Sequence, residues 1–483
     1  MNTTRQKKNS LFGTARAQRA SLLIIVIWIA FALVSITVYF AHSMNFELRA
    51  ADNRVAAIEA EQAIEGAARY VGCVLSNLDV PGSMPDPGAY LCKAVPVGNA
   101  HFWLIGRGMN DQDPQTMAHF GLVDEASKMN VNYASSNMFL DMFTYQPNSD
   151  STIIASILAW RNTNTSLQYG GAESATYMGL QPPYLCKNSK FETVDELRMI
   201  YNMNMNLLVG EDANLNGFLD PNENDGDTLP PSDNRDGQLD PGIWEYLTVY
   251  SHEPTKNTNG VARYNITTFV STTSSGPALL AALTNGTTIT SQRARQIISQ
   301  AAGAGSSSAG ARGGAGGRGS AAVASTTTLF HSPLEFYMRG GMSLSEIAQV
   351  ETNIRGTNVA GLVNVNTAST DVLSCIPGLD TGEATTLTAY RLVNTNILNG
   401  SIGWVTQALP LSNAVVAGPW LTGKTYQYTA DIAAVGHNGR GYRRTRFVFD
   451  TSQGAPNIVY RQDLTHLGWA LGKDALAQAL AAK

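Results

Sequence analysis

Charged residues are scarce in this chain of 483 residues, at 15% of the total, against about 25% in typical domains. The 33 basic and 38 acidic side chains give a formal net charge of −5. The first 20 residues carry several basic side chains and no acidic one, so the remainder is acidic. We therefore expect that the chain after residue 20 does not bind a polyanion such as nucleic acid, because affinity for phosphate backbones depends on clustered lysine and arginine.

Two common hydrolase spacings are also missing. The sequence contains no H-E-x-x-H and no G-x-S-x-G segment, and its 7 histidines never fall at a metal-ligand spacing from one another. We expect no enzymatic activity.

Cysteine is rare, with 4 residues: Cys73, Cys92, Cys186 and Cys375. All follow the hydrophobic run described next, so in an oxidising compartment a disulfide is permitted. Cys73 and Cys92 are the most plausible pair. Buried free thiols are the alternative, and the sequence does not decide between the two.

One long hydrophobic run is present. Leu22 to Phe40 contains no charge, and at ~1.5 Å per residue it is about as long as a bilayer's hydrocarbon core is thick. The basic stub before it predicts a cytoplasmic N-terminus. We expect a leader at residues 1–20 and a single transmembrane helix at 21–42. A cleaved signal peptide is disfavoured, because the run exceeds a signal's apolar region and the helical pattern continues.

That pattern extends well beyond the apolar run. Small or apolar residues recur at spacings of three and four, at Ala57, Ala60, Ile64, Ala67, Val71 and Val74. The spacing predicts one helix of about 55 residues, with its second half packed by one stripe against a globular domain.

The rest of the chain predicts an α/β fold with a large insertion. Short strands are expected at 101–108 and 119–132, and a late hairpin turns at Asn438-Gly439. We expect the hairpin to complete a sheet begun near residue 100. This gives a first part at 43–133, a mainly α-helical insertion at 134–410 and closing strands at 411–483. A segment rich in Gly, Ala and Ser, 303–325, is expected to be a flexible loop.

Residues 211–240 hold the densest group of acids. Five oxygen-bearing residues fall at positions 1, 3, 5, 9 and 12 of a calcium loop: Asp212, Asn214, Asn216, Asp220 and Glu223. Gly217 stands at the sharp turn, and Phe218 would supply a backbone carbonyl. Because only hard oxygen donors are present, Ca²⁺ is favoured over zinc or copper.

A second, looser copy of the loop follows. Asn234, Asp236 and Asp240 repeat the spacing, while Ser232 replaces the first ligand and no Glu closes the loop. Further acids lie between the copies, at Asp225, Asp227 and Asp233. We expect one or two structural calcium ions that order the segment, and the alternative is a solvated acidic loop.

Residues 362–391 have the pattern of a helix-hairpin-helix around Pro377-Gly378. Competence-type DNA receptors combine a similar motif with an N-terminal membrane helix, so a DNA receptor is the alternative function. Asp380 replaces the second hairpin glycine, and acids outnumber bases in the segment. Packing is therefore favoured over DNA contact.

The N-terminal layout resembles the type IV pilin and pseudopilin superfamily, in which a basic leader ends directly before the hydrophobic run. The resemblance implies cleavage by prepilin peptidase between Ala20 and Ser21, although the family prefers Gly at the cut. Ile25 would then be residue five of the mature chain, where most pilins carry Glu. Lack of this Glu is typical of the K subunit of type II secretion systems.

A second signature resembles the same K pseudopilins: D-E-x-x-K-x-N-x-N at Asp124, Glu125, Lys128, Asn130 and Asn132. The resemblance implies a type IV pilin-like fold, an insertion with a helix-hairpin-helix or SAM-like subdomain, and calcium binding. It also implies a minor pseudopilin that starts fibre assembly at the pseudopilus tip and supports protein export. The implied location is the bacterial inner membrane with the bulk periplasmic, and the implied partners are the I and J minor pseudopilins, the major pseudopilin and the inner-membrane assembly platform.

Overall fold

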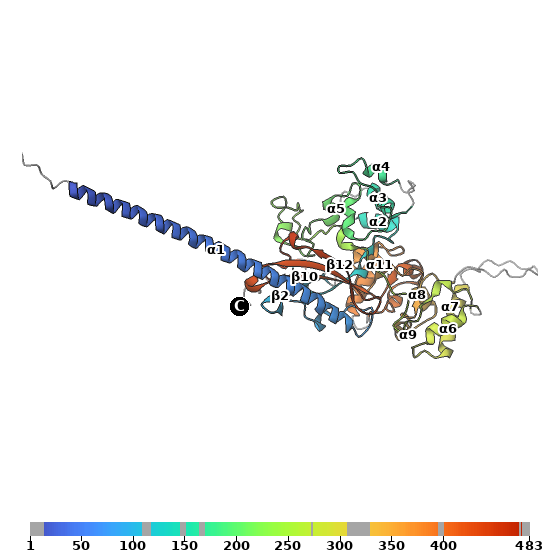
Figure 1. Ribbon diagram of the computed structural model, residues 1–483. Helices are drawn as coiled ribbons and strands as arrows, with labels where there is room; N and C mark the ends of the chain where they lie inside the picture. Colours follow the sequence, from blue (N-terminus) through green and yellow to red (C-terminus); the bar gives the residue numbers. More distant parts are fainter. Residues whose placement is uncertain are drawn as a thin grey trace, which may run out of the picture.

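The computed structural model describes residues 14–108, 117–144, 151–163, 170–271, 274–306, 329–394, 400–472 and 475. Its longest element is α1 (Thr14–Ser76), which extends far beyond the body and then runs along a sheet (Figure 1). Most of the predicted leader and most of the Gly/Ala/Ser-rich segment 303–325 lie outside the described residues.

The two halves of α1 have different surroundings. The side chains of the apolar run are exposed, and this is a helix long and apolar enough to cross a membrane by length and composition. In the second half Ala60, Ile64, Ala67 and Val71 are each at most 2% exposed. The predicted stripe is thus confirmed at these positions.

A six-stranded sheet packs against that stripe, with the order β1-β2-β10-β11-β12 and all pairs antiparallel. Its strands are β1 (Val95–Val97), β2 (Ala100–Ile105), β10 (Gln427–Val435), β11 (Arg443–Asp450) and β12 (Asn457–Asp463), and β3 (Val123–Asp124) pairs with β10. Ile432 of β10 lies opposite Leu104 of β2. The late hairpin therefore completes the sheet begun near residue 100, as predicted.

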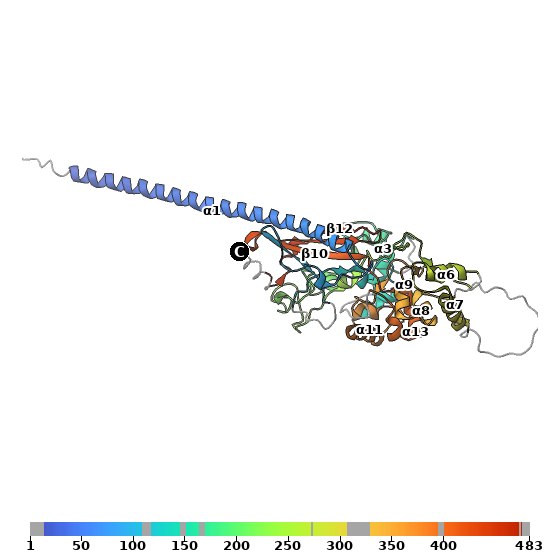
Figure 2. The same ribbon diagram turned by 90° about the horizontal axis from the view of Figure 1, so that it is seen from below.

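Alternation along β10 separates the two faces of the sheet. Ala430, Ile432 and Ala434 pack in the cluster that contains α1. Between them, Asp431 and Ala433 face the opposite side, where Ala433 packs with Trp103. Figure 2 shows α1 along one side of the sheet and much of the remaining chain on the other.

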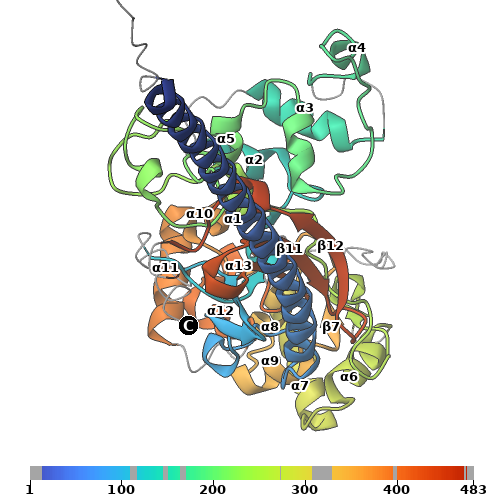
Figure 3. The ribbon, with the colours of Figure 1, turned by 60° about the vertical axis from the view of Figure 1, so that its left-hand side comes forward.

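Short helices joined by one hydrophobic cluster form most of the insertion, and they gather at two places beside the sheet (Figure 3). The α-helices are α2 (Ser136–Thr144), α3 (Ser151–Arg161), α4 (Ser174–Tyr177), α5 (Met205–Val209), α6 (Gly276–Thr284), α7 (Ser291–Ser306), α8 (Pro333–Arg339), α9 (Leu344–Val350), α10 (Thr370–Ser374), α11 (Thr381–Val393), α12 (Val405–Ala408) and α13 (Leu411–Ala417). Short 3₁₀ turns lie at Pro87–Ala89, Glu125–Ser127, Val194–Met199, Pro221–Glu223, Ile243–Tyr246, Ile266–Thr268, Gly418–Trp420, His437–Gly439 and Thr465–Leu467.

Among the described residues, three two-stranded parallel pairs lie in the insertion or tie it to the segments on either side. They are β4 (Met129–Asn130) with β5 (Leu247–Thr248), β6 (Tyr264–Asn265) with β7 (Ile354–Arg355), and β8 (Val363–Asn364) with β9 (Leu421–Thr422). The expectation of closing strands from 411 needs correction, because α13 occupies the start of that stretch and β10 begins only at Gln427. The residues of α13 are mostly small or apolar, and the helix follows Pro410. It forms at this place because it packs against α8.

Candidate metal centre

The predicted calcium-loop residues converge around one turn of chain. Asp212 accepts hydrogen bonds from the backbone N–H groups of Asn216 and Gly217, both at 2.9 Å. Asn214 and Asn216 donate their side-chain amides to Oδ2 of Asp220, at 2.7 and 2.9 Å. Glu223 accepts from the N–H groups of Ala213 and Asp220. The structure therefore brings together the predicted residues at positions 1, 3, 5, 9 and 12.

The backbone of this loop follows the predicted turn. Gly217 has φ of +76° and Leu215 has φ of +56°. Backbone conformations with positive φ favour glycine, which explains why Gly217 stands at the sharp turn. Phe218 is buried, and its N–H donates to Oδ1 of Asn216. The loop is thus held by its own side chains in a closed form.

Burial makes this loop electrostatically costly. It raises the pKa of Glu223 to about 8, and the neighbouring charges of Asp212 and Asp220 add to the rise. Burial likewise raises the pKa values of Asp212 and Asp220. A bound cation would offset the repulsion among these carboxylates.

Within the described part of the chain, no group of three or more His, Cys, Asp or Glu side chains is close enough to hold a metal ion. The loop at 212–223 has only three acids among its predicted ligands, and each accepts hydrogen bonds within the loop. Any cation there would also need the amide oxygens of Asn214 and Asn216 and a backbone carbonyl. This mixed set of hard oxygen donors fits Ca²⁺ in kind.

The second loop is more open and uses a residue that the sequence pattern did not reveal. Asn234 donates to Asp240 at 2.9 Å and to Asp236 at 3.3 Å, and all three residues are exposed. Glu211 accepts from the N–H groups of Asn234 and Asp240. Glu223 does the same for two N–H groups of the first loop, so each loop is held by one glutamate.

The three predicted acids between the loops take different places. Asp233 accepts from the N–H groups of Asp225 and Gly226, both at 2.8 Å. Asp225 accepts from the N–H of Leu229, and the side chain of Asp227 is exposed. Asp233 and Asp225 thus stabilise the turn that connects the two loops.

The D-E-x-x-K-x-N-x-N signature lies in the interior and joins segments that are distant in sequence. Asp124 accepts from Asn364 at 2.8 Å and from Thr367 at 2.6 Å. Glu125 accepts from Thr429 of β10 at 2.5 Å and also bonds Thr248. The signature therefore connects the sheet to the insertion.

The remaining signature residues support the same junction. Asn130 donates to Ser251 at 3.1 Å, and Asn132 exchanges hydrogen bonds with the backbone of Phe191. The ammonium of Lys128 lies 5.2 Å from the centre of the Trp244 ring.

The hairpin between α10 and α11 is covered by protein. Gly378 has φ of +88°, and a Cβ placed there would lie 2.7 Å from Cβ of Val416 in α13. Asn413 donates to the Gly378 carbonyl at 3.0 Å, and Asp380 caps the start of α11. The hairpin backbone thus packs on α13, and this geometry does not favour DNA contact.

The sequence also contains a phosphate-loop spacing. GPWLTGKT at Gly418–Thr425 matches G-x-x-x-x-G-K-[ST], which binds phosphate only between a strand and a helix. Here β9 lies inside the segment and a strand follows it. A Cβ on Gly418 would lie 2.2 Å from Ser332 Oγ, and one on Gly423 would lie 2.3 Å from the Ile402 nitrogen. The glycines are therefore closed off by the protein.

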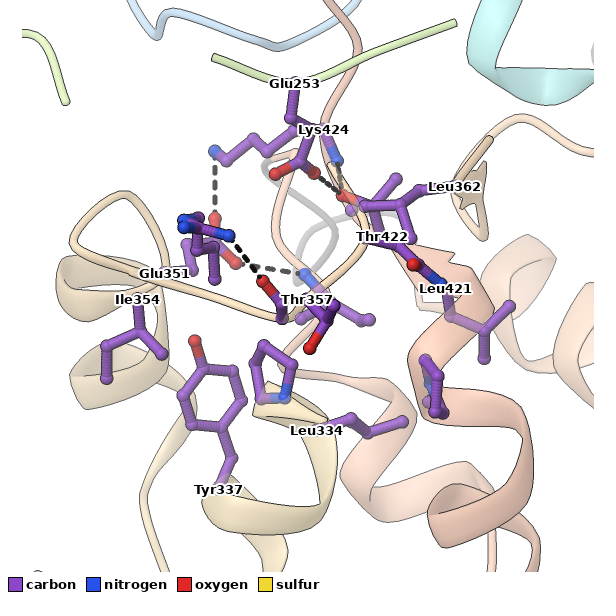
Figure 4. Close-up of a pocket in the computed structure, with 18 of the residues that line it drawn as sticks. Glu253, Leu334, Tyr337, Glu351, Ile354, Thr357, Leu362, Leu421, Thr422 and Lys424 are labelled. Carbon is purple, nitrogen blue, oxygen red and sulfur yellow. Dashed lines mark hydrogen bonds and ion pairs between the residues drawn. The ribbon is translucent and has the colours of Figure 1, made fainter. Parts of the chain in front are cut away.

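The lysine of this segment lines a small cavity of about 70 Å³ (Figure 4). Lys424 is paired with Glu351 at 2.9 Å, and Arg263 with Glu253 at 2.6 Å. Each of these two cations is therefore compensated by its own carboxylate partner.

The N-terminal positions and the cysteines can be placed only in part. Ala20 and Ser21 lie within α1, and Ile25 is 56% exposed. All four cysteines are free thiols, including Cys73 and Cys92, the pair for which the sequence left a disulfide open. Cys73 is on the exposed side of α1, whereas Cys92 is partly buried against the core beside the sheet.

Comparison with known proteins gives one family match. Residues 122–209 match the family model described as type II secretion system (T2SS), protein K. This match confirms, over that segment, the family resemblance predicted from the sequence, and the segment includes the complete D-E-x-x-K-x-N-x-N signature. No curated protein matches the chain.

A solved structure is also similar, the crystal structure of the GspK-GspI-GspJ complex from the enterotoxigenic Escherichia coli Type 2 Secretion System. The match covers 83% of this chain and 96% of the other, with 10% sequence identity and a TM-score of 0.34.

Proposed function

We propose that this chain is a minor pseudopilin of a type II secretion system. The family match at residues 122–209 carries the proposal, because it falls on the segment that joins the sheet to the insertion. The exposed apolar half of α1 supports a single-pass membrane anchor. The basic residues before it favour a cytoplasmic N-terminus, with the bulk of the chain in the periplasm.

The place of the chain in the fibre follows from its N-terminus. We propose that prepilin peptidase cuts between Ala20 and Ser21, which leaves Ile25 as the fifth mature residue. Without a carboxylate there, the subunit cannot neutralise the N-terminal amine of a neighbour. It would therefore cap the tip with the I and J minor pseudopilins, above the major pseudopilin, and start fibre growth on the inner-membrane assembly platform.

Deletion of the gene tests this role. Secretion of exoproteins should be lost while DNA uptake stays intact, and the wild-type gene should restore secretion. Ile25→Leu keeps an apolar residue and should also restore it, whereas Ile25→Glu should restore it poorly. Normal secretion with defective DNA uptake would instead favour the competence-type receptor.

We propose that the loop at 212–223 binds a structural Ca²⁺ ion and that the looser loop at 232–240 binds a second. Asp212, Asn214, Asn216, Asp220 and Glu223, with the carbonyl of Phe218, would hold the first ion. Asn234, Asp236 and Asp240 would hold the second, with Glu211 closing the loop. The convergence of hard oxygen donors around one turn supports this assignment. Calcium would offset the carboxylate repulsion and order the segment.

Chelation tests the calcium proposal on the full chain in detergent. Replacing calcium with EGTA should lower the melting temperature by on the order of 5 °C, as expected for a ligand that binds only the folded state. Glu223→Gln should reduce this shift, because a carboxylate ligand is lost. Asp86→Asn, which alters an acid in another loop, should retain it. An unchanged melting temperature of the wild-type chain in EGTA would contradict the proposal.

A further inference from the structure

Three arginines hold the backbone of the loop at 212–223. Arg444 donates to the carbonyls of Asn214 and Leu215, the latter at 2.7 Å. Arg107 donates to the carbonyls of Asn216 at 3.1 Å and Leu215 at 3.3 Å. Arg446 makes one longer contact, to Leu215 at 3.4 Å. We call Arg107, Arg444 and Arg446 the arginine clamp.

All three arginines come from the sheet. Arg444 and Arg446 lie in β11, and Arg107 follows β2. Arg446 is directly opposite Asp431 in the β10–β11 register, and Arg444 is opposite Ala433. These side chains point away from α1, on the face where the loop lies. The clamp therefore spans two strands of the sheet and a loop of the insertion.

Two carboxylates fix the clamp: Asp431 is buried and Glu245 is partly buried. Asp431 accepts from Arg444 at 2.7 and 2.8 Å and from Arg446 at 2.8 Å. Glu245 accepts from Arg107 at 2.8 and 3.0 Å. The side chains of Arg444 and Asp431 are 0% and 2% exposed. Burial disfavours ionised Asp431, but the two arginines hold its pKa well below the usual range.

Such a clamp resists being pulled apart. If the loop moved away, guanidinium N–H groups would lose their carbonyl partners, which is most unfavourable for Arg444 because its side chain is 0% exposed. A planar guanidinium can bond a carboxylate and a carbonyl at once, whereas an ammonium has no such fork. The loop is thus positioned by contacts that include none of the predicted calcium-binding side chains.

We propose that the arginine clamp positions the loop at 212–223 for cation binding and links that binding to strands β10 and β11. The inference rests on the calcium proposal above. The clamp residues are positioning residues, because they bond the backbone of the loop and none of its ligand side chains. The sheet then contributes to calcium affinity by keeping the loop close to the conformation that binds calcium. Because such coupling between two sites acts in both directions, bound calcium in turn stabilises the sheet.

Calcium affinity of the full chain in detergent, measured by titration calorimetry, tests the clamp. Arg107→Lys keeps the charge next to Glu245 but loses the fork that reaches the loop, so affinity should fall at least about fivefold. Arg446→Lys removes one long contact to the loop, besides changing the pairing with Asp431, and should show a smaller loss. Arg293→Lys is the matched control, because Arg293 pairs with Glu346 and has no contact to the loop among the bonds described.

Each outcome has a distinct meaning. Weaker binding in Arg107→Lys, with Arg293→Lys like the wild type, supports the clamp. Wild-type affinity in Arg107→Lys overturns the clamp but leaves the calcium proposal standing. Absence of calcium binding in the wild type overturns both. If Arg107→Lys fails to fold, Arg446→Lys decides, and wild-type affinity in that variant overturns the clamp.

Discussion

At the scale of single residues, the family signature marks a structural junction. Asp124 and Glu125 are 2% and 5% exposed, and between them they bond residues of β8, of β5 and of the sheet. A buried polar group of this kind is tolerated only when its hydrogen bonds are complete. The signature therefore marks the place where the insertion is attached to the sheet. Its residue types are specified by the hydrogen bonds that they must make there.

Asp124→Ala should strongly destabilise the chain. It would leave the amide of Asn364 and the hydroxyl of Thr367 without their acceptor, and each unpaired buried group costs about 1–3 kcal/mol. We expect a loss of roughly 2–5 kcal/mol in the free energy of unfolding, measured by urea denaturation. Asp124→Asn is the matched variant and should lose less, because its amide retains one acceptor. A loss below about 1 kcal/mol in Asp124→Ala would contradict this role.

Residue spacing predicted which side chains of the loop at 212–223 lie together, because all five positions fall within one short segment and depend on local turns. Calcium binding there stays a prediction. Glu211 and the arginine clamp were not predicted. Arg107 precedes the loop by more than a hundred residues and Arg444 follows it by more than two hundred. Such partners meet only through the tertiary fold, and no local periodicity points to them.

At the scale of elements, the chain uses one turn twice, at the start of the insertion and within it. MNVNYAS at 129–135 and VNVNTAS at 363–369 each begin with a two-residue parallel pair. In each turn, the first Asn accepts from the N–H two residues on, at 3.0 Å. An arginine from a following helix, Arg161 or Arg391, donates to carbonyls of the turn. The repeated residues of this turn can be read in the sequence. The strands could not be predicted from it, because two residues are too few to show a strand periodicity.

The β10–β11 hairpin is fitted closely to α1. A Cβ on Gly436 would lie 2.2 Å from the Ala56 carbonyl oxygen, and one on Gly441 would lie 2.3 Å from the Ala57 nitrogen. His437 in the turn bonds Glu59 at 2.6 Å and Asp52 at 2.9 Å, and Arg440 also pairs with Asp52. The hairpin is thus fixed to α1 where the helix enters the body.

This contact predicts a dependence on pH. Hydrogen bonds to Glu59 and Asp52 raise the pKa of His437 above 6.5. Its contribution to stability is therefore complete below pH 6.5 and is lost as the pH rises through the raised value. Melting temperatures of the wild type and His437→Gln should differ most in mildly acidic buffer and converge in alkaline buffer. His466→Gln, at an exposed histidine, should follow the wild type. A difference that does not change with pH would contradict the contact.

Large elements were the most predictable. The charge-free run and the stripe after it predicted α1, and strict alternation predicted β10 and β11. The predicted start of the closing strands at residue 411 was wrong, because α13 is short and its residues are compatible with either a helix or a strand. Local pattern specifies long periodic elements, whereas tertiary packing decides the short ones.

At the scale of the whole molecule, the anchor, the sheet and the insertion form one connected body. One face of the sheet packs on α1, and the other holds the arginine clamp and the loop at 212–223. The signature at 124–132 joins the sheet to the helical insertion. This arrangement supports a membrane-anchored subunit whose body is attached to its helix over much of the sheet.

Co-purification from membranes tests the central claim most directly. The full chain, tagged at its C-terminus and expressed at its natural level, is isolated in mild detergent and its partners are identified by mass spectrometry. A minor pseudopilin of a type II secretion system should bring the I and J minor pseudopilins with it. Recovery without any pseudopilin, or with DNA-uptake proteins instead, would contradict the account.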